Sequence, residues 1–244
     1  MLSLLGLFSV AVIFLAAIVR GFSGFGFSLL AVSALTLLSP PSEVVPTIFL
    51  LEVAASLHLL PSIWKDVQWR SLMPLILGCG LATPVGAYAL ATLPASPMQI
   101  ALSLFVLVSV VFLWSGFTLK KVPSTAATMG IGAASGLFNG ALAMGGPPVI
   151  VFYFASPIGM AAGRASLIGY ILATDTLGLA SLAWHGLITR DALLRAALFL
   201  PALLAGVWLG ARGFKSVNEV VFRKIVLIIM AVLAPVGGVK ALLG

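Results

Sequence analysis

Two long stretches without a charged residue constrain this chain most. Residues 71–119 hold 49 positions without Asp, Glu, Lys or Arg, and residues 122–163 hold another 42. Each stretch is long enough for two membrane helices, at roughly 20 residues per crossing. Over all 244 residues, only 8% are charged and 61% are hydrophobic, whereas a soluble domain carries about 25% charged residues. The sequence therefore predicts an integral membrane protein.

Helices are the expected spanning elements, because a backbone in hydrocarbon must satisfy its own hydrogen bonds. We predict an all-α polytopic protein with ten helical segments, at residues 2–20, 27–38, 43–62, 70–92, 97–118, 124–142, 147–156, 160–184, 191–211 and 219–243. The first segment lacks a basic start and a small-residue cleavage site, so we interpret it as a retained helix rather than a signal peptide. The segments at 27–38 and 147–156 are too short to span a bilayer comfortably. Each follows a glycine-rich break, Gly21-Phe22-Ser23-Gly24-Phe25-Gly26 or Met144-Gly145-Gly146-Pro147-Pro148.

The two halves of the chain resemble each other. Short matches recur in the same order: Gly21 to Gly24 with Gly136 to Gly140, Ser39-Pro40 with Ser156-Pro157, and Gly86-Ala87 with Gly210-Ala211. We predict two transmembrane repeats within one membrane domain, residues 1–121 and 122–244. Five segments per half would make these repeats inverted, which is a common architecture of secondary transporters.

The basic residues indicate an orientation. With ten crossings, ten of the 13 basic residues fall on one side and Arg190, Arg195 and Lys240 on the other. The positive-inside rule then places both termini outside the cytoplasm. Eight crossings would split the basic residues about 7 to 6. This topology explains the net charge of +7 without a nucleic-acid partner, and it predicts a multi-pass protein of the bacterial inner membrane, embedded in lipid.

The two breaks are candidate anion sites. Glycine clusters in membrane segments are first of all packing devices. A discontinuous helix, however, also exposes backbone N–H groups and a positive dipole end, which attract an anion. From the breaks alone both interpretations stay open. Ser28 adds a small donor beside the first break. The candidate substrate-binding residues are Arg20, Ser23, Gly24, Gly26, Asn139, Gly140, Gly145, Gly146 and Arg164.

Four charged residues lie within or beside the predicted spans. Arg20 and Arg164 could bind an oxyanion through bidentate hydrogen bonds, or could snorkel to the cytoplasmic interface. Glu52 and Asp175 are the only acids deep within predicted spans, in segments that correspond between the halves. Each acid either pairs with an arginine, balancing its charge, or relays protons.

The sequence holds no motif of an enzyme. His58 and His185 lie in different segments without metal-ligand spacing. There is no His-Glu-x-x-His, no P-loop and no Gly-x-Ser-x-Gly motif. We therefore predict a protein that is not an enzyme and that uses neither a metal nor a cofactor. The single cysteine, Cys79, lies in an apolar span and is predicted to be a packing residue.

These motifs together resemble the TauE/SafE family of sulfite and organosulfonate exporters. The resemblance covers nearly the whole chain and rests on the two breaks, on Gly136 to Gly140 and on the stretch from Arg164 to Asp175. It implies a secondary carrier that moves a small sulfur-containing oxyanion, sulfite-like or a small organosulfonate, chiefly outward. It also implies that the two glycine-rich turns meet near the centre.

Other functions remain open at this point. The transport alternative is a proton-coupled uptake permease for a related anion such as thiosulfate. An intramembrane enzyme or an assembly factor fits the sequence less well, because catalytic groups and a soluble surface are both missing. The sequence is compatible with a homo-oligomer.

Overall fold

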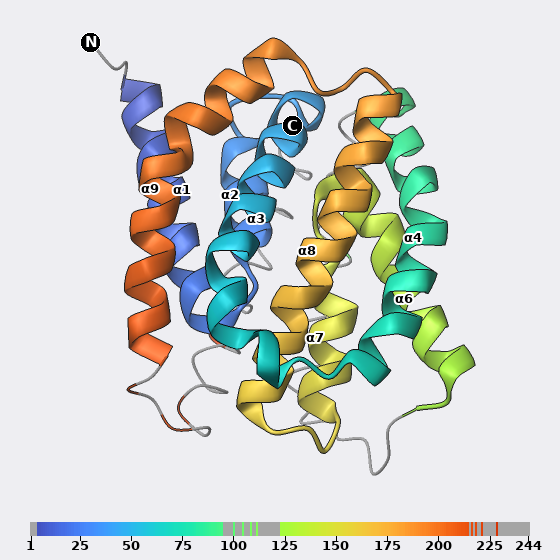
Figure 1. Ribbon diagram of the computed structural model, residues 1–244. Coiled ribbons are helices and arrows are strands. Elements are labelled where there is room, and N and C mark those ends of the chain that lie inside the picture. The colour runs from blue at the N-terminus through green and yellow to red at the C-terminus, as the bar shows by residue number, and fades with distance from the viewer. Residues whose placement is uncertain are drawn as a thin grey trace.

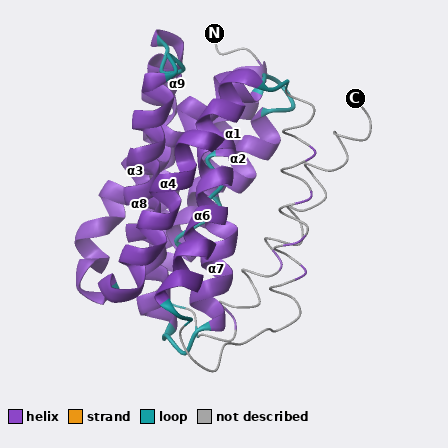
Figure 2. Cartoon of the chain, turned by 90° about the vertical axis from the view of Figure 1, so that its right-hand side faces the viewer, coloured by secondary structure: helices purple, strands orange, loops and turns teal. Residues whose placement is uncertain are grey.

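The computed structural model describes residues 4–94 and 123–214, together with the single positions 100, 104, 108, 111, 216, 218, 221 and 228. Within this part the protein is helical and contains no strand (Figures 1 and 2). Its elements are α1 (Leu4–Ser23), α2 (Phe27–Leu35), α3 (Pro41–Ile63), the 3₁₀ helix η1 (Trp64–Asp66), α4 (Trp69–Thr92), α6 (Thr125–Leu142), α7 (Gly146–Ala155), α8 (Met160–Trp184) and α9 (Arg190–Phe214). The segments predicted at 97–118 and 219–243 lie outside the described residues.

The all-α fold class is confirmed for the described part of the chain, and eight predicted segments correspond to a helix. Three predicted ends were wrong by three residues, those of α1, α2 and α9, and the last of these continues to Phe214 instead of ending at residue 211. Helix α1 continues to Ser23 because Gly24 N still donates to Arg20 O at 2.8 Å. Helix α2 stops at Leu35, where a hydrogen-bonded turn that includes Thr36 follows. The number of ten segments and the inverted arrangement stay predictions.

Five helices are long and apolar enough to cross a membrane: Leu5–Ser23, Pro41–Asp66 (α3 with η1), Trp69–Thr92, Met160–Trp184 and Arg190–Phe214. Large apolar side chains also cover the outer faces of these helices. Leu15, Leu81 and Leu194 are all more than half exposed. A soluble protein rarely exposes apolar surface on this scale. The outer surface is therefore suited to lipid.

Two pairs of helices pack side by side and in parallel. In Figure 1, α1, α3 and α9 run downward along the chain, while α4, α6 and α8 run upward. Helix α1 packs along α9, and α4 packs along α6. A Cβ added to Gly210 would overlap the carbonyl oxygen of Ile18, and one added to Gly140 would overlap that of Thr83. These glycines therefore allow close helix packing rather than breaking a helix.

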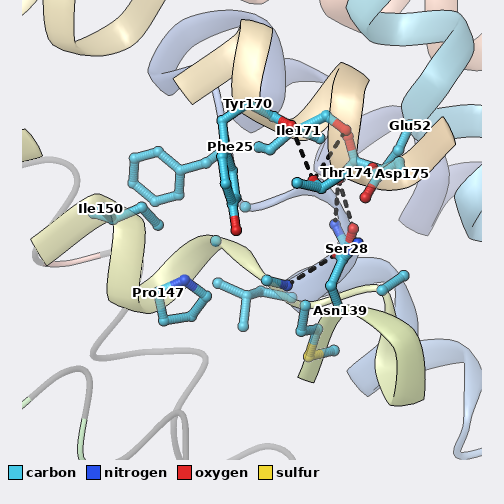
Figure 3. A pocket seen from close by; sticks show the side chains of 16 residues that line it. Phe25, Ser28, Glu52, Asn139, Pro147, Ile150, Tyr170, Ile171, Thr174 and Asp175 are labelled. Atoms are coloured by element: carbon cyan, nitrogen blue, oxygen red, sulfur yellow. Dashed lines mark hydrogen bonds between the residues drawn. The ribbon is translucent and has the colours of Figure 1, made fainter. Parts of the chain in front are cut away.

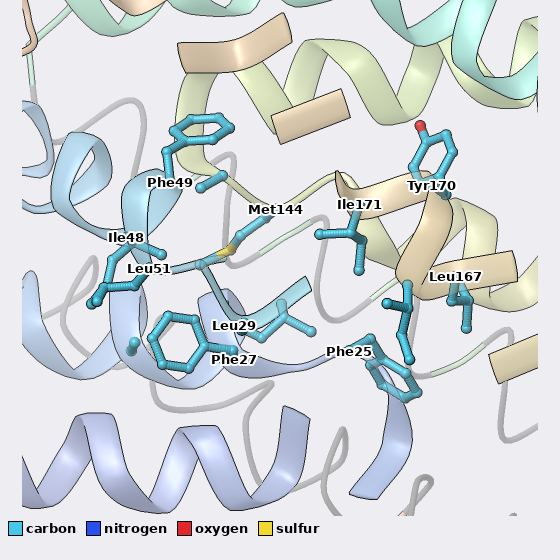
Figure 4. Close-up of a cluster of buried hydrophobic side chains, with 14 of the residues drawn as sticks. Phe25, Phe27, Leu29, Ile48, Phe49, Leu51, Met144, Leu167, Tyr170 and Ile171 are labelled. Carbon is cyan, nitrogen blue, oxygen red and sulfur yellow. The ribbon is translucent and has the colours of Figure 1, made fainter. Parts of the chain in front are cut away.

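The pairing crosses the predicted boundary between the halves. The first helix of the N-terminal half lies against α9 of the other half, and α6, the first helix of that half, lies against α4. Helices α3 and α8 also pack together, and the short helices α2 and α7 lie beside them (Figure 1). Apolar side chains from α2, α3 and α8, among them Phe27, Phe49 and Ile171, fill the space around the first break (Figure 4).

Candidate functional site

Both glycine-rich breaks contribute to one cavity. Its volume is about 20 Å³, which is room for roughly one water molecule and far below the roughly 300–1,000 Å³ of ligand pockets. Its lining combines the first turns of α2 and α7 with side chains from α3, α6 and α8 (Figure 3). The lining residues are Phe25, Gly26, Ser28, Leu29, Glu52, Asn139, Ala143, Met144, Gly145, Gly146, Pro147, Ile150, Tyr170, Ile171, Thr174 and Asp175.

The first break turns sharply between α1 and α2. Gly24 and Gly26 have φ angles of 83° and 91°, which side chains with a Cβ rarely adopt. The hydroxyl of Ser23 lies 2.8 Å from the carbonyl oxygen of Val19 and 2.7 Å from that of Phe25. Ser23 therefore stabilises the turn, and the turn brings the N-terminus of α2 to the cavity.

The second break is held by side chains of α6 and α8. Asn139 Oδ1 accepts a hydrogen bond from Gly145 N at 3.2 Å. The hydroxyl of Ser135 donates to the carbonyl oxygen of Gly145 and accepts from the Tyr170 hydroxyl at 2.7 Å. Ala143 ends α6 in the left-handed region, with φ of 57°. As a result, the N-terminus of α7 faces the same cavity as that of α2.

This convergence has an electrostatic consequence. The first N–H groups of a helix have no partner within the helix, and the helix dipole adds a partial positive charge at that end. Two such ends therefore favour a negative charge between them.

Arg20 and Glu52 form a buried ion pair next to the first break. Arg20 Nε lies 2.9 Å from Glu52 Oε2, and both side chains are almost fully buried. Arg20 also donates to Ser56 Oγ at 2.6 Å and to the carbonyl oxygen of Gly24. The alternative that Arg20 snorkels to the interface was therefore wrong. Of the two alternatives for Glu52, the structure shows the pairing with an arginine.

The other oxygen of this carboxylate occupies the start of α2. Glu52 Oε1 accepts hydrogen bonds from Ser28 Oγ at 2.6 Å and from Ser28 N at 3.3 Å. A carboxylate at this position is stabilised by the positive end of the helix dipole. The carboxylate of Glu52 is thus an anionic group that the protein itself places at the N-terminal end of α2.

Arg164 lies behind the first break. Its guanidinium donates to the carbonyl oxygens of Gly21 and of Phe22, the latter at 3.0 Å. Its Cζ lies 4.3 Å from the centre of the Phe214 ring. A cation in this position complements the negative C-terminal end of α1. The side chain is buried, so snorkelling was a wrong interpretation for Arg164 as well. Because both arginines are buried, they no longer count as charges at the membrane surface. The predicted split of basic residues between the two sides then becomes eight against three.

Two buried polar atoms that line the cavity have neither a hydrogen-bond partner nor an ion-pair partner among the described residues. They are Asn139 Nδ2 and Asp175 Oδ2. Asn139 is 2% exposed and Asp175 is 1% exposed. Because buried polar groups are normally hydrogen-bonded, these two atoms mark where a ligand would complete the site.

The structure brings together only part of the predicted binding set. The residues that line the cavity are Gly26, Asn139, Gly145 and Gly146, and both acids, Glu52 and Asp175, join them there. The cavity lining does not include Arg20, Ser23, Gly24, Gly140 or Arg164. Their contacts support the breaks and the helix packing instead.

Sequence reasoning missed Tyr170, Thr174 and Ile150, which also line the cavity. Nothing in their spacing distinguishes them from other residues in apolar helices. Cys79 is fully buried, as predicted for a packing residue. In the ranges that the structure describes, no three His, Cys, Asp or Glu side chains lie close enough to hold a metal ion.

Membrane transporters hold small solutes between broken helices deep within the protein, and this chain has the same arrangement inside an apolar exterior. It is a multi-pass membrane protein of the transporter class. Residues 9–235 match the family model of the sulfite exporter TauE/SafE, and the chain belongs to that family. A relative from Cupriavidus necator, described as "Probable sulfite/organosulfonate exporter TauE", is 26% identical over 201 residues, which cover 80% of this chain and 77% of the relative. No solved structure matches the chain.

Proposed function

We propose that this protein is a secondary carrier that moves a small sulfur-containing oxyanion, sulfite-like or a small organosulfonate, outward across a bacterial inner membrane. One observation carries the proposal. The N-termini of α2 and α7 share a single cavity with the unpartnered amide nitrogen of Asn139. The amide of Asn139 and the N–H of Gly146 suit the acceptor oxygens of such an anion. The next two residues of α7, Pro147 and Pro148, have no N–H, so this end acts mainly through the helix dipole.

The arginines act indirectly in this proposal. Arg20 fixes Glu52 at the start of α2, and Arg164 holds the end of α1. The substrate would be bound by Asn139 and by the backbone around Gly26, Gly145 and Gly146. Neutral donors bind an anion less tightly than a bidentate arginine does, which suits a carrier that must also release its substrate.

Two inverted repeats, residues 1–121 and 122–244, are part of the same proposal. Its support is the exchange of helices, in which α1 pairs with α9 and α6 pairs with α4. In addition, α1 and α6 run in opposite directions in Figure 1. Inverted repeats would allow the carrier to alternate between two related conformations around a central site.

The membrane potential is a sufficient driving force for export. The cell interior is negative, so an anion leaves with a gain of about 2.3 kcal/mol per charge per 100 mV. This corresponds to a concentration ratio of about 40-fold for each net charge that is moved. An exporter that moves the anion with a net charge would therefore need no coupling ion. Proton-coupled uptake of an anion such as thiosulfate is the alternative, and the unpartnered Asp175 favours it.

Anion flux from liposomes tests the proposal. Purified protein is reconstituted into liposomes that are loaded with labelled sulfite or thiosulfate, and a potassium gradient with valinomycin makes the interior negative. We expect faster efflux than from protein-free liposomes, acceleration by the potential, and a large loss of flux with Asn139→Leu. Wild-type efflux equal to that of protein-free liposomes for sulfite, thiosulfate and sulfoacetate alike would rule out the carrier.

A further inference from the structure

We infer that Asp175 carries a proton while the oxyanion is bound, so that the site holds one anion together with one proton. This inference rests on the proposed function, because it concerns the same cavity. It assigns to Asp175 a role in binding that differs from the role of Glu52, although both carboxyl groups line that cavity (Figure 3).

The two acids have different surroundings. Glu52 has a cationic partner in Arg20 and two donors from Ser28. Asp175 is buried just as deeply, but its Oδ2 has no partner among the described residues. The neutral side chain of Asn139 is its nearest donor. A buried carboxylate without a cation next to it is strongly disfavoured, whereas a protonated carboxyl group carries no charge.

Among the residues that the structure describes, the groups that face Asp175 from the neighbouring helices do not supply a free positive charge. Helix α3 contributes Glu52, whose charge is balanced by Arg20 of α1. Helix α6 contributes the neutral Asn139. The nearby titratable groups are Cys79 of α4 and Tyr170 of α8 itself.

Arg164 is the remaining cation near the breaks. Its donors point to the carbonyl oxygens of Gly21 and Phe22 rather than to the cavity. It therefore does not balance a second carboxylate in the cavity, and an ionised Asp175 would repel an incoming anion at short range.

Protonation removes this repulsion and adds a donor. The carboxyl O–H of Asp175 and the amide N–H of Asn139 then line the same cavity as the N-terminus of α7. All three can donate to an oxyanion. An ionised aspartate could only accept hydrogen bonds, and so could most of the oxygens of the substrate.

The bound proton changes the net charge that is transported. A sulfonate monoanion bound with one proton crosses without net charge, so the membrane potential should not affect its flux. A dianion such as thiosulfate retains one net charge and should still respond to the potential. Comparison of methanesulfonate with thiosulfate in the liposome assay therefore separates this inference from an uncoupled carrier.

Binding at equilibrium gives the direct test. The dissociation constant of purified wild-type protein for thiosulfate and for methanesulfonate is measured by calorimetry from about pH 5 to about pH 10. Both probes stay fully ionised in that range, and the buffers contain choline instead of sodium. We expect the Kd to rise with pH and to approach tenfold per pH unit, with net uptake of one proton at high pH. With Asp175→Asn, both the pH dependence and the proton uptake should be absent.

Glu43→Gln provides a matched control, because it makes the same carboxyl-to-amide change at an exposed position of α3. It should retain the wild-type pH dependence, and cooperative thermal unfolding shows whether each variant is folded. A wild-type Kd that is independent of pH would overturn the inference. The inference would also be overturned if the Kd of Asp175→Asn depended on pH as strongly as that of wild type. Binding that requires sodium instead of a proton would overturn it as well. Absence of binding of either probe, and of sulfite, by folded wild-type protein would instead overturn the proposed function itself.

Discussion

The ion pair between Arg20 and Glu52, with Nε 2.9 Å from Oε2, ties the last turn of α1 to the middle of α3 inside the protein. Neither side chain is significantly exposed. Their charges are therefore balanced by each other and by Ser28 and Ser56 rather than by water. The pair fixes the first break beside the cavity, which Glu52 lines, and several measurable consequences follow from its burial.

Arg20→Ala should destabilise the protein by about 3–5 kcal/mol, because it leaves the carboxylate of Glu52 buried without a cation. Thermal unfolding of the purified protein in detergent measures the effect. The double variant Arg20→Met, Glu52→Gln removes both charges and should recover much of the lost stability.

The exposed ion pair between Arg195 and Glu43, with N and O 3.0 Å apart, is the control for this prediction. Arg195→Ala should change stability by about 1 kcal/mol or less, because exposed pairs contribute little. Equal effects of Arg20→Ala and Arg195→Ala would show that the Arg20–Glu52 pair is not buried in the folded protein.

Gly140→Ala should lower stability by about 1–3 kcal/mol, because the new methyl group would push α6 away from α4. The added Cβ would overlap the carbonyl oxygen of Thr83. Gly130, in the same helix, has no atom within 4 Å of an added Cβ. Gly130→Ala should leave stability unchanged or raise it by up to about 1 kcal/mol. If the midpoints of thermal unfolding fall equally for the two variants, the packing of α4 on α6 is not as described.

Asn139→Leu should weaken anion binding about 10- to 100-fold, the usual loss when one hydrogen bond to a charged group is removed. Asn139→Asp keeps the acceptor for Gly145 N but removes the Nδ2 donor and adds a negative charge, so it should also weaken binding. Calorimetry with thiosulfate measures both effects.

The exposed Thr176 of α8 supplies a control for the site. Thr176→Val should bind thiosulfate like wild-type protein. Wild-type affinity in both Asn139 variants would show that this side chain does not contact the anion.

The connections between helices should be accessible from opposite sides of the membrane. In Figure 1 the α2–α3 and α8–α9 connections lie at one end of the bundle and the α3–α4 connection lies at the other. Lys65 and Arg70 flank the latter connection, and the positive-inside rule places it in the cytoplasm. In a Cys79→Ala background, Pro40→Cys and Thr189→Cys should react with an impermeant maleimide in intact cells. Gln68→Cys should react only after lysis, and its labelling in intact cells would contradict this orientation.

Hydropathy was sufficient to predict most helices, because lipid imposes long apolar spans and turns are short. Helix α8 has the predicted bounds, Met160–Trp184. The ends beside the first break were less predictable, since they depend on local hydrogen bonds such as that from Gly24 N to Arg20 O. Helix η1 carried no signal in the hydropathy, because it is a single turn.

The site was predictable only in outline. The glycine-rich sequences identified the two breaks, and two acids were recognised as intramembrane charges. Which acid pairs with which arginine depends on the packing of α1 against α3, and Arg20 and Glu52 lie 32 positions apart in the sequence. The positions of Tyr170 and Thr174 depend on which face of α8 points to the cavity. Because α8 is apolar on all sides, its hydropathy pattern does not show which face that is.

The contact of α1 with α9 also affects how the protein is made. Gly21 packs on the backbone of Val207, so two surfaces that must meet lie 186 positions apart in the sequence. At roughly 5–20 residues per second, α1 waits about 10 to 40 s for its partner to be synthesised. During that interval the glycine face of α1 has no partner helix. Glu52 in α3, 32 positions after Arg20, is synthesised long before α9, and Glu43, which precedes it, pairs with Arg195 instead. Early pairing of Arg20 with Glu52 would keep the first helix in the bilayer until the chain is complete.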